Sequence, residues 1–125
     1  MNDEVIYVGK YNTKYNNILG LNYKEYEIVR SKGLPSHMIK RKHFCALKHI
    51  DDIKDIVNNP DYIGYDSKEE NKSILFIKKF ETNILLTCKV DIDNDRLYVA
   101  TVYEKEDKKI QRWLHSGRII ALTNQ

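Results

Sequence analysis

Residues 73–103 read SILFIKKFETNILLTCKVDIDNDRLYVATVY, and this stretch decides the fold. It contains three apolar runs, at residues 73–80, 83–90 and 96–103, which are separated by short polar turns. A parallel return needs a crossover of about a dozen residues or more, so these strands are expected to run antiparallel. Together with the preceding run DYIGY at residues 61–65, the pattern predicts a four-stranded antiparallel β-meander.

Alternation within these runs predicts two different sheet faces. Side chains alternate between the faces of a strand, so the even-numbered residues of 84–90 share one face and the odd-numbered residues of 85–89 share the other. One face is therefore expected to be dry and the other mixed. The adjacent Lys78 and Lys79 must point to opposite faces. Either lysine could neutralise a phosphate beside the sheet, or could be a structural side chain with a buried stem.

The rest of the chain predicts helices around this sheet. Apolar residues recur every three or four positions from Leu47 to Val57, which predicts a helix that ends before Pro60. A second short amphipathic helix is expected to lead into His115. The less regular residues before Leu47 include an asparagine-rich turn or loop at 12–22. The expected class is α+β, an N-terminal section and a helix packed on the four-stranded sheet.

Composition and charge limit the class of protein. The chain has 125 residues, 42% hydrophobic and 31% charged, which suits a single globular domain over residues 1–125. A net charge of +3 and a pI near 8.7 allow an anionic partner, but fall short of the pI above about 9 of dedicated nucleic-acid binders. Two cysteines without CxxC spacing exclude a disulfide framework. The acidic start MNDE and the lack of a long apolar run predict a soluble cytoplasmic protein without a membrane segment.

Four histidines are the first candidates for proton transfer, because only imidazole titrates unassisted near neutral pH. His37, His43 and His49 stand six residues apart, which matches no common metal-ligand spacing, so neither a metal nor another cofactor is expected. His49 falls inside the helical pattern and is expected to be structural. His37, His43 and His115 have polar, basic or glycine-flanked surroundings, which suit catalysis and an ordinary surface position equally well.

Two short segments could bind a phosphate. The run KRKH at residues 40–43 is the densest cationic stretch, and its alternative is a solvated surface. The run HSGR at residues 115–118 joins an imidazole, a hydroxyl, a flexible glycine and a guanidinium, and its alternative is an ordinary loop. The sequence has no glycine-rich phosphate loop, GxSxG elbow or DxDxDG loop, so nucleotide hydrolysis, serine hydrolysis and calcium binding are unsupported.

The order of several segments resembles a known nuclease superfamily. These segments are GLPSHMIKRKH, NNPDYIGYD, LFIKKFETNILLTCKVD, RLYVATVYE and RWLHSGR. Over about residues 28–119 they are similar to the phage-associated branch of the barnase, EndoU, colicin and RelE-like (BECR) nucleases. The resemblance implies one or two helices followed by a curved four-stranded antiparallel sheet. It also implies a metal-independent endoribonuclease, acting as a phage or mobile-element effector or toxin.

The resemblance implies three kinds of site residue. Histidines would transfer protons, lysines and arginines would hold the phosphate, and hydroxyl groups would orient it. The candidates for catalysis are His37, His43, Lys78, Lys79, Thr101, Tyr103, His115, Ser116 and Arg118. The candidates for substrate binding are Lys40, Arg41, Lys42 and Arg112. The expected proton-transfer pair is His43 or His37 with His115, and the expected strand cation is Lys78 or Lys79. The 2′-hydroxyl of RNA would attack the adjacent phosphorus, so no metal would be needed.

Two other classes of function stay open at this point. The domain could bind RNA or protein without cleaving it, using the cationic run and exposed tyrosines as stacking platforms. It could also be a toxin whose surface is built chiefly to meet an antitoxin or immunity protein. Cleavage of RNA to 2′,3′-cyclic phosphates in the presence of EDTA would separate the nuclease from the binding module.

Overall fold

The computed structural model describes residues 4–68 and 72–122. Most of the acidic start MNDE, from which a protein without a secretory signal was predicted, lies outside the described residues. The elements in chain order are β1 (Val5–Lys10), α1 (Tyr15–Leu19), β2 (Glu27–Ser31), α2 (Leu34–Lys40), α3 (Phe44–Leu47), the 3-10 helix η1 (Ile50–Asp52), α4 (Ile53–Asn58), β3 (Tyr62–Asp66), β4 (Ser73–Lys79), β5 (Asn83–Asp91), β6 (Arg96–Lys105), α5 (Asp107–Ser116) and β7 (Ile119–Ala121). The chain has the expected mixture of helices and strands.

The described strands form one sheet, and it is larger than the sequence predicted. Seven strands lie in the order β1-β2-β6-β5-β4-β3-β7 instead of the expected four. Consecutive strands from β3 to β6 pair antiparallel, whereas β2 pairs parallel to β6. The β1–β2 hairpin extends the sheet at one edge, and the chain returns after α5 to add β7 at the other. Long-range pairing of this kind leaves no periodic signal in the sequence.

The helix predicted from Leu47 to Val57 is broken into α3, η1 and α4. The break is at His49, whose two ring nitrogens lie 2.8 Å from Asp52 Oδ2 and 2.8 Å from Glu81 Oε1. The ring also stacks on Phe80, with 4.1 Å between the ring centroids. These contacts tie the broken helix to the β4–β5 turn, and the bond from His49 is the main cause that lowers the pKa of Glu81. His49 thus has the structural contacts that the helical pattern predicted.

The asparagine-rich segment, predicted as a turn or loop, contains the short helix α1. Asn16 orders this segment, because its Oδ1 accepts hydrogen bonds from the Tyr11 hydroxyl at 2.7 Å and from the Tyr23 N–H at 3.2 Å. Its Nδ2 donates to the Tyr23 carbonyl at 2.8 Å. Side-chain bonds of this type can replace part of the backbone pairing of a loop, which composition does not reveal.

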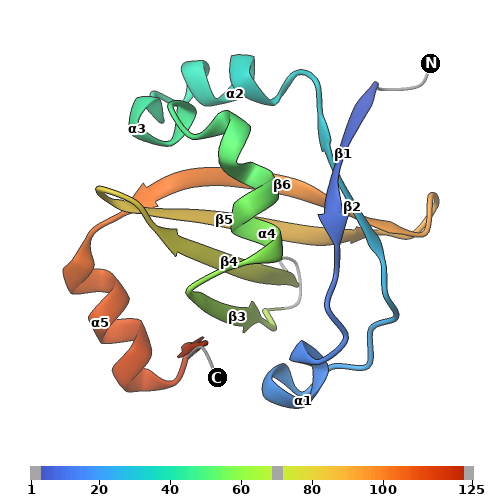
Figure 1. Cartoon of the computed structure of the whole chain (residues 1–125), viewed down its shortest axis with the longest axis vertical. Coiled ribbons are helices and arrows are strands. Elements are labelled where there is room, and N and C mark those ends of the chain that lie inside the picture. The colour runs from blue at the N-terminus through green and yellow to red at the C-terminus, as the bar shows by residue number, and fades with distance from the viewer. Residues whose placement is uncertain (1–3, 69–71, 123–125) are drawn as a thin grey trace.

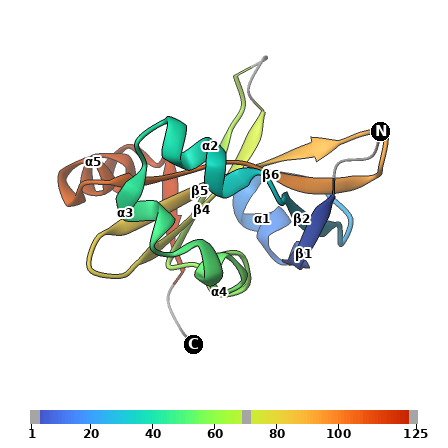
Figure 2. The ribbon, with the colours of Figure 1, turned by 90° about the horizontal axis from the view of Figure 1, so that it is seen from above.

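The two faces of the sheet carry separate apolar clusters (Figures 1 and 2). One cluster is covered by α1 to α4 and includes Phe76, Ile84 and Leu86, all with 0% exposure. The other is covered by α5 and includes Leu85 and Ile110. The predicted alternation along β5 is confirmed, since Thr87, on the same face as Leu85, is only half-buried. Because α5 covers only part of its face, the far part of that face keeps exposed polar side chains.

Gly64→Ala is expected to lower the free energy of unfolding by about 1–3 kcal/mol, the usual cost of overpacking. A Cβ at this position would lie 2.6 Å from the Arg118 carbonyl oxygen and 2.9 Å from an Ile119 methyl carbon, so β7 must move. Urea unfolding followed by circular dichroism measures the change. Gly33→Ala is the control, because its Cβ would meet only Ser31 Oγ at 3.4 Å. Equal stability of the two variants would contradict the crowding at β3 and β7.

Candidate active site

A small pocket lies where α2 and α3 meet β6. It encloses about 80 Å³ and is lined by His37, Met38, Arg41, His43, Thr101 and Val102. Pairing between β2 and β6 ends at Tyr98, so the outer edge of β6 beyond that residue is left for the α2–α3 segment, which lies beside it in Figure 1. The pocket is much smaller than the roughly 300–1,000 Å³ that holds a drug-sized ligand. It has room for one anionic group.

Helix α2 brings His37 and Arg41 to one side of this pocket. Leu34 and Met38 are buried and anchor the helix on the core, at 5% and 1% exposure. His37 and Arg41 are four residues apart, so they are neighbours on the helix surface, and both border the buried stripe. The amphipathic pattern of α2 therefore places an imidazole and a guanidinium where the helix meets the strand.

A left-handed turn at Lys42 directs His43 to the same pocket. Lys42 has a φ of 61°. The Lys42 N–H donates to the Ile39 carbonyl and the His43 N–H to the Met38 carbonyl, which is the hydrogen-bond pattern of a Schellman cap. A non-glycine residue in this region costs of order 1–3 kcal/mol, and such strain clusters at functional sites. The strained turn places His43 at the start of α3, facing β6.

Glu104 of β6, which was not among the residues predicted from sequence, contacts His43. Its Oε1 lies 3.5 Å from His43 Nδ1, and its Oε2 accepts a hydrogen bond of 3.2 Å from the Ala46 N–H. The carboxylate therefore connects the imidazole to the first turn of α3. Alternation along β6 contains the signal, because it puts Glu104 on the same face as buried Val102, where an acidic side chain needs partners.

Hydroxyl groups lie on the adjacent part of the sheet. Thr101 and Thr87 face each other across β6 and β5, and their Oγ1 atoms are 2.7 Å apart. A β-bulge interrupts the β5–β6 pairing directly beside them, which is common near active sites. The Tyr103 ring lies 5.8 Å from the His43 ring. Thr101 and Tyr103, both predicted from sequence, are thus next to the histidine pocket.

Tyr103 also borders a second group of charges. The Lys105 Nζ is 5.0 Å from the centroid of the Tyr103 ring and 5.3 Å from that of Trp113. Arg118 lies over the same Trp113 ring at 4.9 Å, with one guanidinium nitrogen 3.6 Å from Asp66 Oδ2. Burial raises the pKa of the Tyr103 hydroxyl, and the Arg118 charge opposes this rise. The phenol is therefore a hydrogen-bond donor at neutral pH.

The two strand lysines point to opposite faces, as predicted, but both make structural contacts away from this pocket. Lys78 Nζ donates to the Asn59 carbonyl at 2.8 Å, at the end of α4. Lys79 Nζ donates to Asp107 Oδ1 at 2.6 Å, in the first turn of α5. That bond is the main cause that lowers the pKa of Asp107. The structure gives neither lysine a contact with the histidines.

The segment HSGR ends α5 as a helix cap. Gly117 has a φ of 82°, its N–H donates to the Leu114 carbonyl, and the Arg118 N–H donates to the Trp113 carbonyl. This is again the Schellman pattern, which explains the glycine without a ligand. The Ser116 hydroxyl donates to the Trp113 carbonyl at 3.1 Å. Helix α5 leads away from α2 and α3 in Figure 1. His115 is exposed in the last turn of α5 and is not among the residues that line the pocket.

The remaining basic candidates lie on exposed surfaces. Lys40 and Lys42 are exposed at the end of α2, next to Arg41, and Arg112 is exposed on α5. Among residues 4–68 and 72–122, no three His, Cys, Asp or Glu side chains converge as metal ligands. Within the same ranges, no helix is long and apolar enough to cross a membrane.

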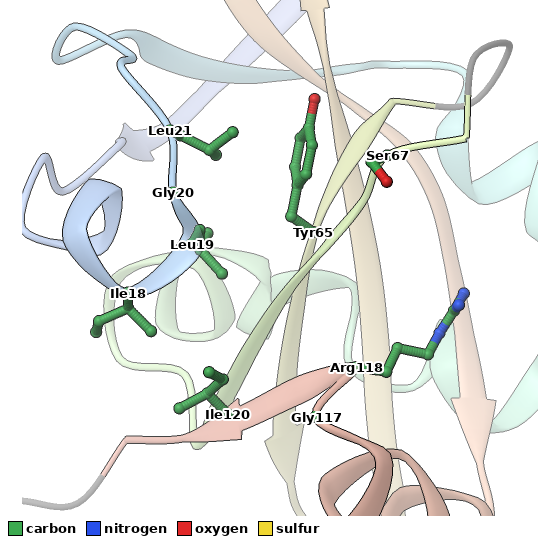
Figure 3. A pocket seen from close by; sticks show the side chains of 9 residues that line it. All are labelled: Ile18, Leu19, Gly20, Leu21, Tyr65, Ser67, Gly117, Arg118 and Ile120. Carbon is green, nitrogen blue, oxygen red and sulfur yellow. The ribbon is translucent and has the colours of Figure 1, made fainter.

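A larger hollow of about 410 Å³ lies elsewhere, between the end of α1 and β7 (Figure 3). Ile18, Leu19 and Ile120 project into it, whereas the Arg118 guanidinium points away from them. Its lining combines these apolar side chains with Tyr65, Ser67 and Arg118 and contains none of the histidines. His37 and His43 therefore line the small pocket beside β6 and not this larger hollow.

Comparison with known proteins identifies the fold family. A family model described as phage-Barnase-EndoU-ColicinE5/D-RelE like nuclease3 matches residues 6–112. The chain belongs to this family. Neither the curated proteins nor the solved structures contain a match. The matched range includes the whole pocket beside β6 and extends the resemblance of about residues 28–119 to the N-terminal section, while His115 and Arg118 lie beyond its end. The protein is a nuclease of the phage-associated BECR type.

Proposed function

We propose that this nuclease is a ribonuclease that cleaves RNA by transesterification in the pocket between α2, α3 and β6. The observation that carries the proposal is the convergence of His37, Arg41 and His43 with Thr101 on one hollow of about 80 Å³. These groups suit phosphodiester cleavage. One imidazole can accept a proton, the other can donate a proton, and the guanidinium can hold the charged oxygens of the phosphate.

In the proposed reaction, His43 is the general base. It takes the proton of the 2′-hydroxyl while the 2′-oxygen forms a bond to the adjacent phosphorus. Glu104, 3.5 Å from Nδ1, would stabilise the imidazolium that results. This arrangement leaves Nε2 of the ring for the substrate.

His37 is then the general acid. It gives a proton to the 5′-oxygen as the bond from that oxygen to phosphorus breaks, so the products are a 2′,3′-cyclic phosphate and a free 5′-hydroxyl. Arg41 would hold the two non-bridging oxygens, because a planar guanidinium can donate to both. Thr101 would supply a further hydrogen bond from the strand. In this proposal the pair His37 and His43 replaces the pair with His115 that the sequence suggested.

Purified protein is expected to convert single-stranded RNA into fragments that end in 2′,3′-cyclic phosphates. The rate should be the same in excess EDTA as without chelator. Mass spectrometry of the fragment ends identifies the product. DNA of the same sequence has no 2′-hydroxyl and is the control substrate. Intact RNA after long incubation with protein shown to be folded would instead support the binding module, and cleavage of DNA at the same rate would contradict the 2′-hydroxyl mechanism.

A further inference from the structure

Two cations from different elements meet on the single tryptophan of the chain. Lys105, at the end of β6, and Arg118, after α5, both lie within about 5 Å of the Trp113 ring, at 5.3 and 4.9 Å. Cations are held over aromatic faces by the ring quadrupole, which leaves their N–H groups free to donate elsewhere. The indole, on α5, therefore has positive charges from two different elements close to its ring.

The charge in this cluster is only partly compensated. Among the described residues, the one carboxylate within ion-pair distance of either cation is Asp66, 3.6 Å from Arg118. Lys79, by comparison, is held by Asp107 at 2.6 Å. Two cations with one long carboxylate contact leave a net positive charge at this place, which favours binding of an anion with several oxygens.

Tyr103 joins this spot to the proposed catalytic pocket. Its ring centroid lies 5.8 Å from that of His43 and 5.0 Å from Lys105 Nζ. An anion at Lys105 and a phosphate beside His43 would therefore be next to each other on the molecule. In RNA, the anion nearest to a phosphate undergoing cleavage is the next phosphate of the same strand.

We propose that Lys105 and Arg118, held over Trp113, form a second phosphate subsite, so that the protein recognises an RNA strand by two consecutive phosphates. This inference rests on the proposed function for the identity of the pocket beside it. It moves Arg118 from the phosphate that is cleaved, where the sequence placed it, to the neighbouring one. Dinucleotides with a single phosphate would then be poor ligands.

Fluorescence of Trp113 reports on this subsite directly, since it is the only tryptophan. The probes are 2′-fluoro trinucleotides of one base sequence, which cannot be cleaved through a 2′-hydroxyl. One probe has both internucleotide phosphates, and in the other one of the two is replaced by a neutral methylphosphonate. We expect the two-phosphate probe to bind at least about tenfold more tightly, and Lys105→Gln to remove most of this gain and reduce the salt dependence by about one phosphate contact. Lys108→Gln, the same charge change on the exposed side of α5, should keep the gain.

Equal affinity of wild-type protein for the two probes would overturn the subsite, as would an equal loss in the Lys105 and Lys108 variants. Fluorescence anisotropy of a labelled probe detects binding that leaves the indole emission unchanged. If neither measurement detects binding, the proposed subsite is also overturned. These probes test binding only. If the protein binds the probes as expected but leaves RNA intact, the proposed catalysis is wrong and the subsite stands. If RNA is cleaved normally but the two probes bind with equal affinity, the subsite is wrong and the proposed catalysis stands.

Discussion

His43→Ala is expected to lower the rate of RNA cleavage by about 10²- to 10⁴-fold, the usual contribution of a general base or acid. The ring faces the pocket, and Glu104 Oε1 lies 3.5 Å from its Nδ1. The fold should tolerate the change, because the His43 side chain makes no capping hydrogen bond to α3. Initial rates on a fluorescent oligoribonucleotide measure the effect, and the thermal midpoint should move by only a few degrees.

Glu104→Gln separates positioning from proton transfer in the same site. Glu104 is proposed to act through His43, so the double variant with His43→Ala should be no slower than His43→Ala alone. Glu104→Gln keeps the imidazole, so its loss should fall mainly on kcat and should change the pH profile of kcat.

His115 provides the decisive comparison for the site assignment. Full activity in His43→Ala together with inactive His115→Ala would overturn the pocket and favour the terminal segment that the sequence suggested. The toxin role that the resemblance implied from sequence has a separate readout. If the chain is a toxin, expression of the wild-type chain should arrest growth and expression of His43→Ala should not. Normal growth with the active chain would contradict the toxin role and leave the nuclease in place.

Phe76→Ala is expected to lower the free energy of unfolding by about 3–5 kcal/mol, a large part of the roughly 5–15 kcal/mol that holds a domain folded. Phe76 has 0% exposure and lies in β4 between Ile63 and Leu86, against the Tyr15 ring at 6.4 Å. Truncation removes its buried area and leaves a cavity that the surrounding strands cannot close. Urea unfolding should show a lower midpoint with the same slope.

Phe44→Ala is the matched control for this change. The same side chain is removed, but Phe44 is 56% exposed on α3, so the free energy of unfolding should change by about 0.5 kcal/mol or less. A small effect of Phe76→Ala, equal to that of Phe44→Ala, would contradict the position of Phe76 at the centre of the larger apolar cluster.

The strands and their faces could be predicted from sequence because their signal is local. Side chains alternate along β5, and this pattern by itself places Leu86 in the core and Thr87 on the mixed face. The same rule separated Lys78 from Lys79. The end of α4 followed from the geometry of Pro60, which excludes further helix.

The candidate site was harder to predict because its residues come from segments that meet only in the folded chain. His37, His43, Thr101 and Tyr103 were candidates by residue type, but nothing in the sequence showed that they share one place. The segment HSGR looked chemically richer, yet its glycine serves a helix cap. Glu104 was missed because an acidic residue in a strand becomes informative only when its neighbours are known.

By itself, the sequence determined the class of fold, the course of the central strands and the side chains that can exchange protons, because each depends on residue type or on spacing within one element. Only the tertiary structure decided which of those side chains meet. The open edge of β6 and the strained turn at Lys42 bring His43 to Glu104, whereas His115 lies in the last turn of α5 and does not line the pocket. These positions depend on contacts between residues far apart in the chain, for which no local pattern exists.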